Sequence, residues 1–309
     1  MTRRILTVTL NPAIDVTYRV DVLRPGETVR VPDVRSRAGG KGVNVAAVVR
    51  RLGGESLVLA LTTTRTPDEF RDGLDGLGLA HRLVPALPAV RRTVAVVTRA
   101  DGTTMLQENG FPAGETAEAG IFAALRAELS AGAGAVVISG SVPEGLGADV
   151  PARLVRLCGR HDVPVIADVS GAALREAAGS GAVLMPNEDE LKELAGSGAE
   201  ACQDLVAAGA PAVVATAGPD GATAVTARGA WRARPAEVVT GNPAGAGDAA
   251  AAALAVHLSA GGVSEVDWPV ALADVVATSA AAVLRPVAGE IDVAARERWI
   301  RAVEVERIR

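Results

Sequence analysis

Short apolar segments alternate with longer segments of helical periodicity along most of the chain, and this alternation limits the folds it can adopt. The apolar segments that predict strands are 5–10, 56–61, 135–139, 163–168, 183–185 and 212–216. The segments with helical spacing are 39–52, 67–77, one beginning at 115, 151–161, 246–285 with a break at Gly261-Gly262, and 293–303. This order predicts an α/β fold with a doubly wound, mostly parallel sheet flanked by helices.

Two segments near the N-terminus, residues 12–37 and 87–110, interrupt this alternation. Each contains two short strand-like pieces, 16–20 with 28–31 around Pro25-Gly26, and 93–98 with 103–106 around Asp101-Gly102. We expect the two hairpins to meet as one small antiparallel β lid. The main domain would then consist of residues 1–11, 38–86 and 111–309.

Composition and charge argue against several classes of protein. A hydrophobic fraction of 49% with a net charge of −5 indicates a globular chain without a basic field for nucleic acid or a membrane surface. Cys158 and Cys202 lie too far apart for a metal-binding pair, and the three histidines form no zinc motif. We find no signal peptide and no apolar run of the roughly 18–20 residues that span a bilayer. We therefore expect a soluble, cytoplasmic protein with reduced thiols.

A glycine-rich loop, residues 241–249, precedes an alanine-rich helical segment. Backbone N–H groups in such a loop, next to a helix N-terminus, can bind an anion, and Asp248 lies in the first turn. Residues 245–250 also match the G-x-G-x-x-A dinucleotide pattern, but this copy lies late in the chain rather than after a first strand. A turn that only allows close helix packing is a further alternative.

Two other segments carry residues suited to ligand binding. Residues 39–44, Gly-Gly-Lys-Gly-Val-Asn, form a second glycine-rich loop that opens a helix, although a structural turn explains it equally well. Asn187 and Glu190 follow the strand at 183–185, where a capped acidic helix start is the alternative. Asp168 also follows a strand. Ligands of open α/β sheets bind at such strand ends, so these side chains could hold Mg²⁺ through water.

With these segments in place, the chain resembles the ribokinase-like (PfkB) carbohydrate kinases over essentially its whole length. It is most similar to the branch with 1-phosphofructokinase, tagatose-6-phosphate kinase and the minor 6-phosphofructokinase. The segments that carry the resemblance are 9–15, 39–44, 139–143, 168–171, 187–190 and 245–248, which occur in the family's order.

The resemblance implies a role for each matching residue. Asp248 matches the catalytic base, and the N–H groups of Gly245, Ala246 and Gly247 match the anion hole. The matches to sugar contacts are Asp15, Gly39, Gly40, Lys41 and Asn44. The matches to nucleotide contacts are Asn187, Glu190, Thr216, Gly218 and Gly221, with Mg²⁺ held by Asn187, Glu190 and, through water, Asp168. Because Asp248 opens a helix, we also expect its carboxylate to be ionised at neutral pH.

A substrate that already carries a phosphate needs cationic partners. Arg30 and Arg91, which has Arg92 beside it, fall where the phosphosugar branch has its contacts, and Ser139 or Ser141 could add a hydroxyl. The chain departs from the branch at Met185-Pro186-Asn187, where the branch usually has Lys-Pro-Asn, and at residues 107–110 and 242–244. These departures put the substrate and the ATP affinity in doubt more than the reaction class.

The resemblance therefore predicts a kinase that uses ATP and Mg²⁺ to phosphorylate a ketohexose phosphate, foremost fructose 1-phosphate to fructose 1,6-bisphosphate. Tagatose 6-phosphate and fructose 6-phosphate are further candidates. A kinase for an unphosphorylated sugar or nucleoside, and a sugar-phosphate-binding protein without turnover, stay open as alternatives. An apolar face on the lid sheet would favour a homodimer.

Overall fold

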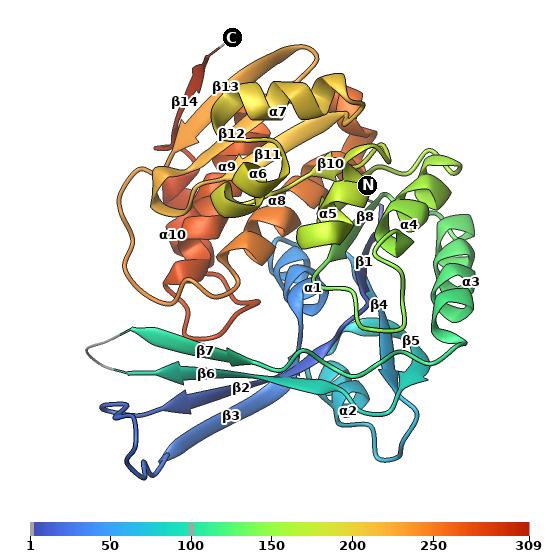
Figure 1. The fold of residues 1–309 in the computed structure, drawn as a ribbon. Helices are drawn as coiled ribbons and strands as arrows, with labels where there is room; N and C mark the ends of the chain where they lie inside the picture. The colour runs from blue at the N-terminus through green and yellow to red at the C-terminus, as the bar shows by residue number, and fades with distance from the viewer. Residues whose placement is uncertain (1–2, 99–101, 309) are drawn as a thin grey trace.

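The structure, a computed structural model, describes residues 3–98 and 102–308. Within these residues the strands form a large sheet and a small sheet (Figure 1). The large sheet is 10-stranded in the described residues, in the order β14-β13-β12-β11-β10-β9-β8-β1-β4-β5. Pairing is parallel from β11 to β5 and antiparallel from β11 to β14. The strands are β1 (Ile5–Thr9), β4 (Ser56–Thr63), β5 (Ala80–Leu87), β8 (Ala135–Ser139), β9 (Val165–Asp168), β10 (Val183–Leu184), β11 (Ala212–Thr216), β12 (Ala222–Thr226), β13 (Gly229–Arg234) and β14 (Glu304–Arg307).

Helices cover both faces of the large sheet, which confirms the doubly wound α/β fold. Buried residues of α3, α4, α5 and α7 pack on one face, and those of α1, α8 and α9 pack on the other. The helices are α1 (Lys41–Arg51), α2 (Glu69–Gly76), α3 (Ala117–Ser130), α4 (Val150–Gly159), α5 (Gly171–Ala178), α6 (Glu188–Leu194), α7 (Gly198–Ala207), α8 (Ala246–Gly261), α9 (Trp268–Val283) and α10 (Val293–Trp299). In α8 the run 249–253 consists of fully buried alanines, whose small side chains allow the helix to lie close to its neighbours.

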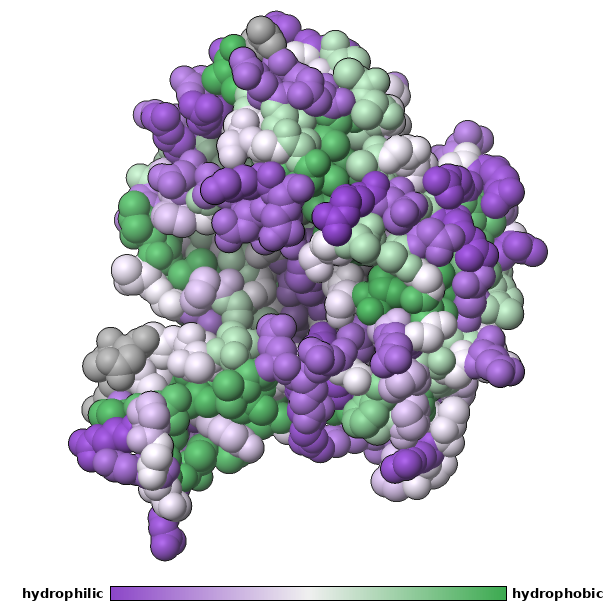
Figure 2. All heavy atoms as spheres, viewed as in Figure 1, coloured by the Kyte–Doolittle hydropathy of each residue, from purple (hydrophilic) through white to green (hydrophobic). Residues whose placement is uncertain are grey.

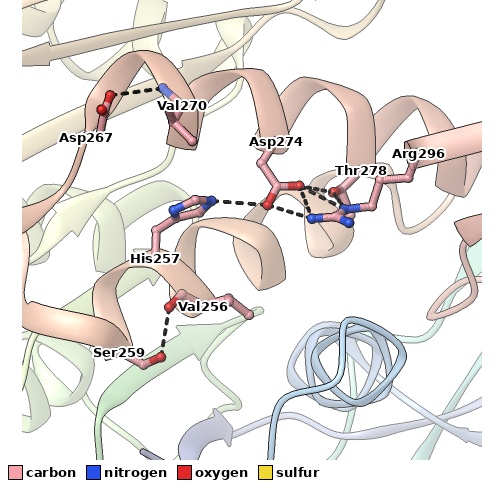
Figure 3. A network of polar contacts seen from close by, with 8 residues as sticks. All are labelled: Val256, His257, Ser259, Asp267, Val270, Asp274, Thr278 and Arg296. Carbon is pink, nitrogen blue, oxygen red and sulfur yellow. Dashed lines mark hydrogen bonds and ion pairs between the residues drawn. The ribbon is translucent and has the colours of Figure 1, made fainter. Parts of the chain in front are cut away.

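A buried ion-pair network fixes the helices around α8 (Figure 3). Asp274 on α9 accepts hydrogen bonds from Arg296 on α10 at 2.8 and 2.9 Å and from Thr278 at 2.8 Å. His257 on α8 lies 3.1 Å from the same carboxylate. Burial alone would raise the pKa of Asp274, but the hydrogen bonds and the charge of Arg296 outweigh it and lower that pKa to about 2. The helix that carries Asp248 is therefore anchored at its far end.

The small sheet lies beneath the main body in Figure 1 and has the order β3-β2-β6-β7. Its strands are β2 (Ala13–Arg19), β3 (Asp33–Gly39), β6 (Arg91–Val97) and β7 (Thr103–Gln107). The predicted antiparallel pairing holds for β2 with β3 and for β6 with β7, but β2 and β6 pair in parallel. β2 follows β1 and β6 follows β5, and β1 and β5 run in the same direction in the large sheet. Both lid strands therefore leave from the carboxyl ends of parallel strands, which accounts for their parallel pairing.

The predicted second strand at 28–31 is wrong, because β3 begins at Asp33 and residues 20–32 form a largely exposed loop. Pro32 has no N–H group to donate and separates this loop from the strand. The second hairpin is confirmed, although Asp101 of its expected turn lies outside the described residues.

Some strands of the large sheet are missing from the sequence prediction. β5 contains Pro85 and occupies the sheet edge, where proline is tolerated, and β12 and β13 are rich in alanine. Residues 293–303 were expected to be helical throughout, but α10 ends at Trp299 and the chain then enters β14. Alanine has a low β-propensity, so the alanines of β12 and β13 weaken the strand pattern in the sequence.

In the described residues no helix is long and apolar enough to cross a membrane. Cys158 and Cys202 are both free and buried. Burial raises the pKa of the Cys158 thiol to about 12, so it stays protonated at neutral pH.

Candidate active site

The N-terminus of α8 is built by the glycine-rich loop. Gly245 caps the helix in the left-handed conformation, with φ +85°, and a Cβ at this position would lie 2.8 Å from the Cβ of Ala288. The N–H groups of Gly245 and Gly247 have no hydrogen-bond acceptor among the described residues. The N–H of Ala246 donates to Pro243 O at 3.1 Å, so it is not open in the way expected for an anion-hole donor.

Asp248 lies in the first turn of α8 and is 6% exposed. Its Oδ2 accepts a hydrogen bond from Nδ2 of Asn44 at 2.9 Å. Burial, together with the nearby charge of Asp168, raises the pKa of Asp248 to about 7, although Lys41 and Asn44 act in the opposite direction. The expectation that this carboxylate is ionised at neutral pH holds only in part, because burial brings its pKa close to neutrality.

Lys41, the first residue of α1, forms an ion pair with Asp168 at the end of β9. Its Nζ donates to Oδ1 of Asp168 at 3.1 Å, and the charge of Asp168 raises the pKa of the lysine. Oδ2 of Asp168 is buried and has no hydrogen-bond partner among the described residues. One carboxylate oxygen is thus committed to Lys41, and the other is open to a further partner.

Asp15 on β2 lies where the lid sheet meets the main body. It accepts hydrogen bonds from Oγ1 of Thr93 at 2.5 Å and from the backbone N–H of Gly40, while burial raises its pKa. A Cβ at Gly39 would lie 2.0 Å from Oδ2 of Asp15. Only glycine at position 39 therefore leaves room for the carboxylate in this position.

A cavity of about 350 Å³ brings together most of the residues predicted to bind the sugar. Figure 2 shows the corresponding hollow between the lid and the main body. The predicted residues that line the cavity are Asp15, Gly40, Lys41, Asn44, Arg91, Gly245, Gly247 and Asp248. This cavity is polar on several sides and contains charges of both signs, which suits a hydroxylated anion.

Arg91 occupies the lid side of this cavity. Its Nη1 donates to Glu108 O at 2.9 Å and its Nε to Asn11 O at 3.4 Å, so these two carbonyl groups hold the guanidinium in place. Arg92 instead pairs with Glu69 at 2.8 Å and does not line the cavity.

Arg30 and Ser139 are not brought to this cavity. Arg30 is exposed and lines an adjoining groove of about 1190 Å³, which shares Asn242 and Pro286 with the cavity. Ser139 is 2% exposed, and its hydroxyl has no hydrogen-bond partner among the described residues. Ser141 accepts a hydrogen bond from Nδ2 of Asn11 at 2.9 Å.

A second cavity of about 500 Å³ lies on the other side of the α8 N-terminus. It is lined by the predicted nucleotide contacts Thr216, Gly218 and Gly221 and by apolar side chains such as Val276. Such a lining suits a planar heterocycle such as a purine. Gly247 lines both cavities, so the α8 N-terminus separates them.

Asn187 and Glu190 form a capping box at the start of α6. Oδ1 of Asn187 accepts from the Glu190 N–H at 2.9 Å, and Oε2 of Glu190 accepts from the Asn187 N–H at 3.0 Å. Asn187 also forms a parallel bridge with Thr216, which places the box beside the second cavity. The two side chains therefore cap their own helix, as the structural alternative predicted, at a position next to the nucleotide cavity.

Sequence reasoning missed Thr93 and Arg37. Thr93 reaches Asp15 only because β2 and β6 pair in parallel, with Asp15 opposite Thr93. Arg37 donates to Oδ1 of Asn44 at 3.3 Å from the end of β3, a strand that was predicted at the wrong position. A correct register for the lid sheet would have revealed both.

The model of the pfkB family carbohydrate kinases matches residues 7–293. The chain is 33% identical to "ATP-dependent 6-phosphofructokinase isozyme 2" of Mycobacterium tuberculosis over 269 residues, which cover 84% of this chain and 78% of that protein. It is also 33% identical to a "1-phosphofructokinase" of Xanthomonas campestris pv. campestris over 271 residues, which cover 84% of this chain and 85% of the relative.

The solved structure of the tetrameric inhibited form of phosphofructokinase-2 from Escherichia coli has the same fold. Its TM-score is 0.86 at 24% identity, with 97% of this chain and 98% of that chain covered. The family match spans most of the chain. The polar cavity and the apolar cavity lie on the two sides of the N-terminus of α8. The chain therefore belongs to the PfkB family of carbohydrate kinases and is a sugar or sugar-phosphate kinase with ATP as its co-substrate.

Proposed function

We propose that this kinase transfers the γ-phosphoryl group of ATP to a hydroxyl of a ketohexose phosphate, foremost fructose 1-phosphate, giving fructose 1,6-bisphosphate and ADP. The observation that carries the proposal is the position of Gly247, which lines both the polar cavity and the apolar cavity. A nucleotide in the apolar cavity and a sugar in the polar cavity would meet at the N-terminus of α8. Asp248 would then face the acceptor hydroxyl.

In this mechanism Asp248 takes the proton of the sugar hydroxyl while the oxygen attacks the γ-phosphorus and ADP leaves. A pKa of about 7 makes Asp248 a better proton acceptor than an ordinary aspartate and still leaves a large ionised fraction at neutral pH. The open N–H groups of Gly245 and Gly247 would stabilise the transferring phosphoryl group. Alignment and electrostatics supply most of the acceleration in phosphoryl transfer.

The residues near the nucleotide cavity fit a Mg²⁺ ion. Mg²⁺ usually binds one or two carboxylates, several waters and the substrate's phosphates. Asp168 offers a buried carboxylate oxygen without a hydrogen-bond partner in the described residues, and Glu190 and Asn187 lie at the neighbouring strand end. When bound there, the ion would neutralise charge on the ATP phosphates.

The phosphate of the substrate would bind to Arg91. Its guanidinium lines the polar cavity and is held by carbonyl oxygens rather than by a carboxylate, so its charge stays available to an anion. Fructose 1-phosphate and fructose 6-phosphate, the substrates suggested by the relatives' names, both carry such a phosphate. Tagatose 6-phosphate has the same chemistry.

A panel assay tests this proposal. Purified enzyme is given MgATP with fructose 1-phosphate, fructose 6-phosphate, tagatose 6-phosphate, fructose, ribose and adenosine, and ADP formation is followed by a coupled reaction. The proposal expects kcat/KM for a ketohexose phosphate to exceed that for fructose by at least about tenfold, the effect of one charged hydrogen bond. Turnover confined to the neutral sugars or adenosine would contradict it. Binding of sugar phosphates without turnover would identify a binding protein instead.

We also propose that two copies of the chain form a homodimer through the lid sheet. Val34 and Leu106 on its strands are 55% and 57% exposed, and apolar side chains gather over this part of the surface in Figure 2. A second copy of the sheet would cover these side chains, and the tetrameric form of phosphofructokinase-2 shows that a relative with this fold assembles. Sedimentation velocity of the wild type and of Leu106→Lys tests this point.

Dependence on ATP agrees with a cytoplasmic location.

A further inference from the structure

We infer that Arg37 is a positioning residue that orients the side-chain amide of Asn44 and, through it, the base Asp248. This inference rests on the proposed role of Asp248. Arg37 lies on β3 directly opposite Asp15 in the pairing with β2. It therefore stands beside two groups predicted to hold the sugar, Asp15 and Asn44.

A chain of hydrogen bonds connects Arg37 to the base. Nη2 of Arg37 donates to Oδ1 of Asn44 at 3.3 Å, and Nδ2 of Asn44 donates to Oδ2 of Asp248 at 2.9 Å. An asparagine amide can rotate by half a turn and exchange its oxygen and nitrogen. The guanidinium has only donors and the ionised carboxylate has only acceptors, so the two together fix the amide with its oxygen toward Arg37 and its NH₂ group toward Asp248.

Arg37 has little freedom to leave this position. Its Nε donates to Ala38 O at 3.3 Å, and the backbone of Gly289 packs against the contact. A Cβ at Gly289 would lie 2.8 Å from Nη2 of Arg37 and 3.0 Å from Oδ1 of Asn44. The loop before α10 therefore closes over the Arg37–Asn44 hydrogen bond.

Stability alone does not explain a guanidinium at this place. Burial lowers the pKa of Arg37, and no carboxylate lies within 4.0 Å of it among the described residues. A half-buried cation without a carboxylate in contact costs some free energy. The compensating interactions are the nearby negative charges of Asp15, Glu290 and Asp248, in that order of strength. Asp15 and Asp248 line the polar cavity, and Arg37 lies behind them in a neighbouring groove that Glu290 also lines, so it can act on the polar cavity only through the residues between.

Removal of Arg37 leaves the amide oxygen of Asn44 without its donor. The amide is then held on one side only, by Asp248, so its NH₂ group no longer keeps the carboxylate in one fixed position beside the acceptor hydroxyl. Loss of a hydrogen bond to a charged group corresponds to about ten- to hundredfold in rate. ATP binds on the other side of α8, so the KM for ATP stays within about twofold, below the cost of a single hydrogen bond.

The experiment compares three variants with the wild type. Arg37→Met keeps the length and removes the donors, whereas Arg37→Lys keeps one charged donor. The matched control is Arg35→Met, which lies on the same strand and whose ion pair, at 3.8 Å, is with Asp33. We expect kcat to fall by about ten- to hundredfold in Arg37→Met, to recover in part in Arg37→Lys and to stay unchanged in Arg35→Met. An active wild type with full kcat in Arg37→Met would overturn the inference.

Two further readouts separate positioning from folding and from the proposed function. If Arg37 acts through Asn44, Arg37→Met has little additional effect on kcat in an Asn44→Ala background, whereas additive losses contradict the inference. The NMR signal of the Asn44 side-chain amide, assigned by its loss in Asn44→Ala, needs no turnover. We expect it to be sharp in the wild type and shifted or broadened in Arg37→Met, and an unchanged signal overturns the inference. A wild type without activity toward any sugar phosphate would refute the proposed function instead.

Discussion

The Asp248 carboxylate accepts a hydrogen bond at 2.9 Å from Asn44, which lies 204 residues earlier in the chain. This contact joins the first turns of α1 and α8, the helices opened by the two glycine-rich loops. The two loops therefore act as one unit, because the first places Asn44 and Lys41 and the second places the base.

Asp248 destabilises the folded protein at neutral pH. Its folded pKa of about 7 lies above its ordinary value of 3.8. Since the unfolded state ionises first, stability falls as pH rises from about 4 to 7, by up to about 4 kcal/mol. Asp248→Asn has no carboxyl group to ionise at this position, so it does not lose this stability as pH rises. Urea denaturation at pH 5 and pH 8 should show the variant gaining stability relative to the wild type as pH rises, and parallel curves for the two proteins would show that the carboxylate is not desolvated.

Gly39→Ala should impair sugar binding and leave ATP binding intact. The added Cβ would lie 2.0 Å from Oδ2 of Asp15, so the carboxylate has to move. We expect the KM for the sugar phosphate to rise by about tenfold or more, as for the loss of a charged hydrogen bond. Gly53→Ala is a control for glycine replacement nearby, since a Cβ there meets no atom within 4 Å, although its φ of +84° carries its own strain. An unchanged KM in Gly39→Ala would remove Asp15 from the sugar site.

Arg91→Met tests the phosphate contact. We expect kcat/KM for a ketohexose phosphate to fall by about ten- to hundredfold, while kcat/KM for unphosphorylated fructose changes little. Arg92→Met is the matched control, because this neighbour pairs with Glu69 and does not line the cavity. Equal losses for fructose and its phosphate would show that Arg91 supports the lid rather than the phosphate.

The ion-pair network around Asp274 in Figure 3 should lose its contribution to folding stability in acid. The folded pKa of Asp274 is about 2, below its ordinary value of 3.8, so its contribution is present above about pH 4 and is lost as pH falls from 4 to 2. This contribution amounts to about 2 kcal/mol.

Asp274→Asn leaves Arg296 without its carboxylate and should cost about 3–5 kcal/mol at pH 7. Asp267→Asn, a helix cap that asparagine also satisfies, should be nearly neutral in urea denaturation. Equal stability of Asp274→Asn and wild type would contradict this account.

The sequence predicted the parallel part of the fold well, because its strands are continuous apolar runs. The segments 135–139 and 212–216 coincide with β8 and β11. β13 was missed because alanine and arginine stand in place of branched residues there, and β12, Ala-Thr-Ala-Val-Thr, has no continuous apolar run of branched residues. Loop 20–32 was predicted as part of a hairpin because Pro25-Gly26 is a turn signal, yet the register of β2 with β3 depends on tertiary contacts.

The candidate site was predictable where glycine restricts the backbone. Gly39, Gly40 and Gly245 mark places where a side chain would collide or where φ is positive. The positions of Arg30 and Ser139 outside the lining of the polar cavity, and the raised pKa of Asp248, were not predictable in this way. Each depends on which atoms surround the side chain after folding, and burial cannot be read from neighbours in the sequence.

The pH dependence of kcat for the wild type and Asp248→Asn tests the central claim most directly. The claim is that Asp248, ionised, accepts the proton of the sugar hydroxyl. With a saturating sugar phosphate, wild-type kcat should fall as pH drops below about 7, because protonated Asp248 cannot act as a base. Asp248→Asn should lose about 10²–10⁴ in kcat and show no such inflection. Near-normal turnover in the folded Asp248→Asn variant would contradict the claim.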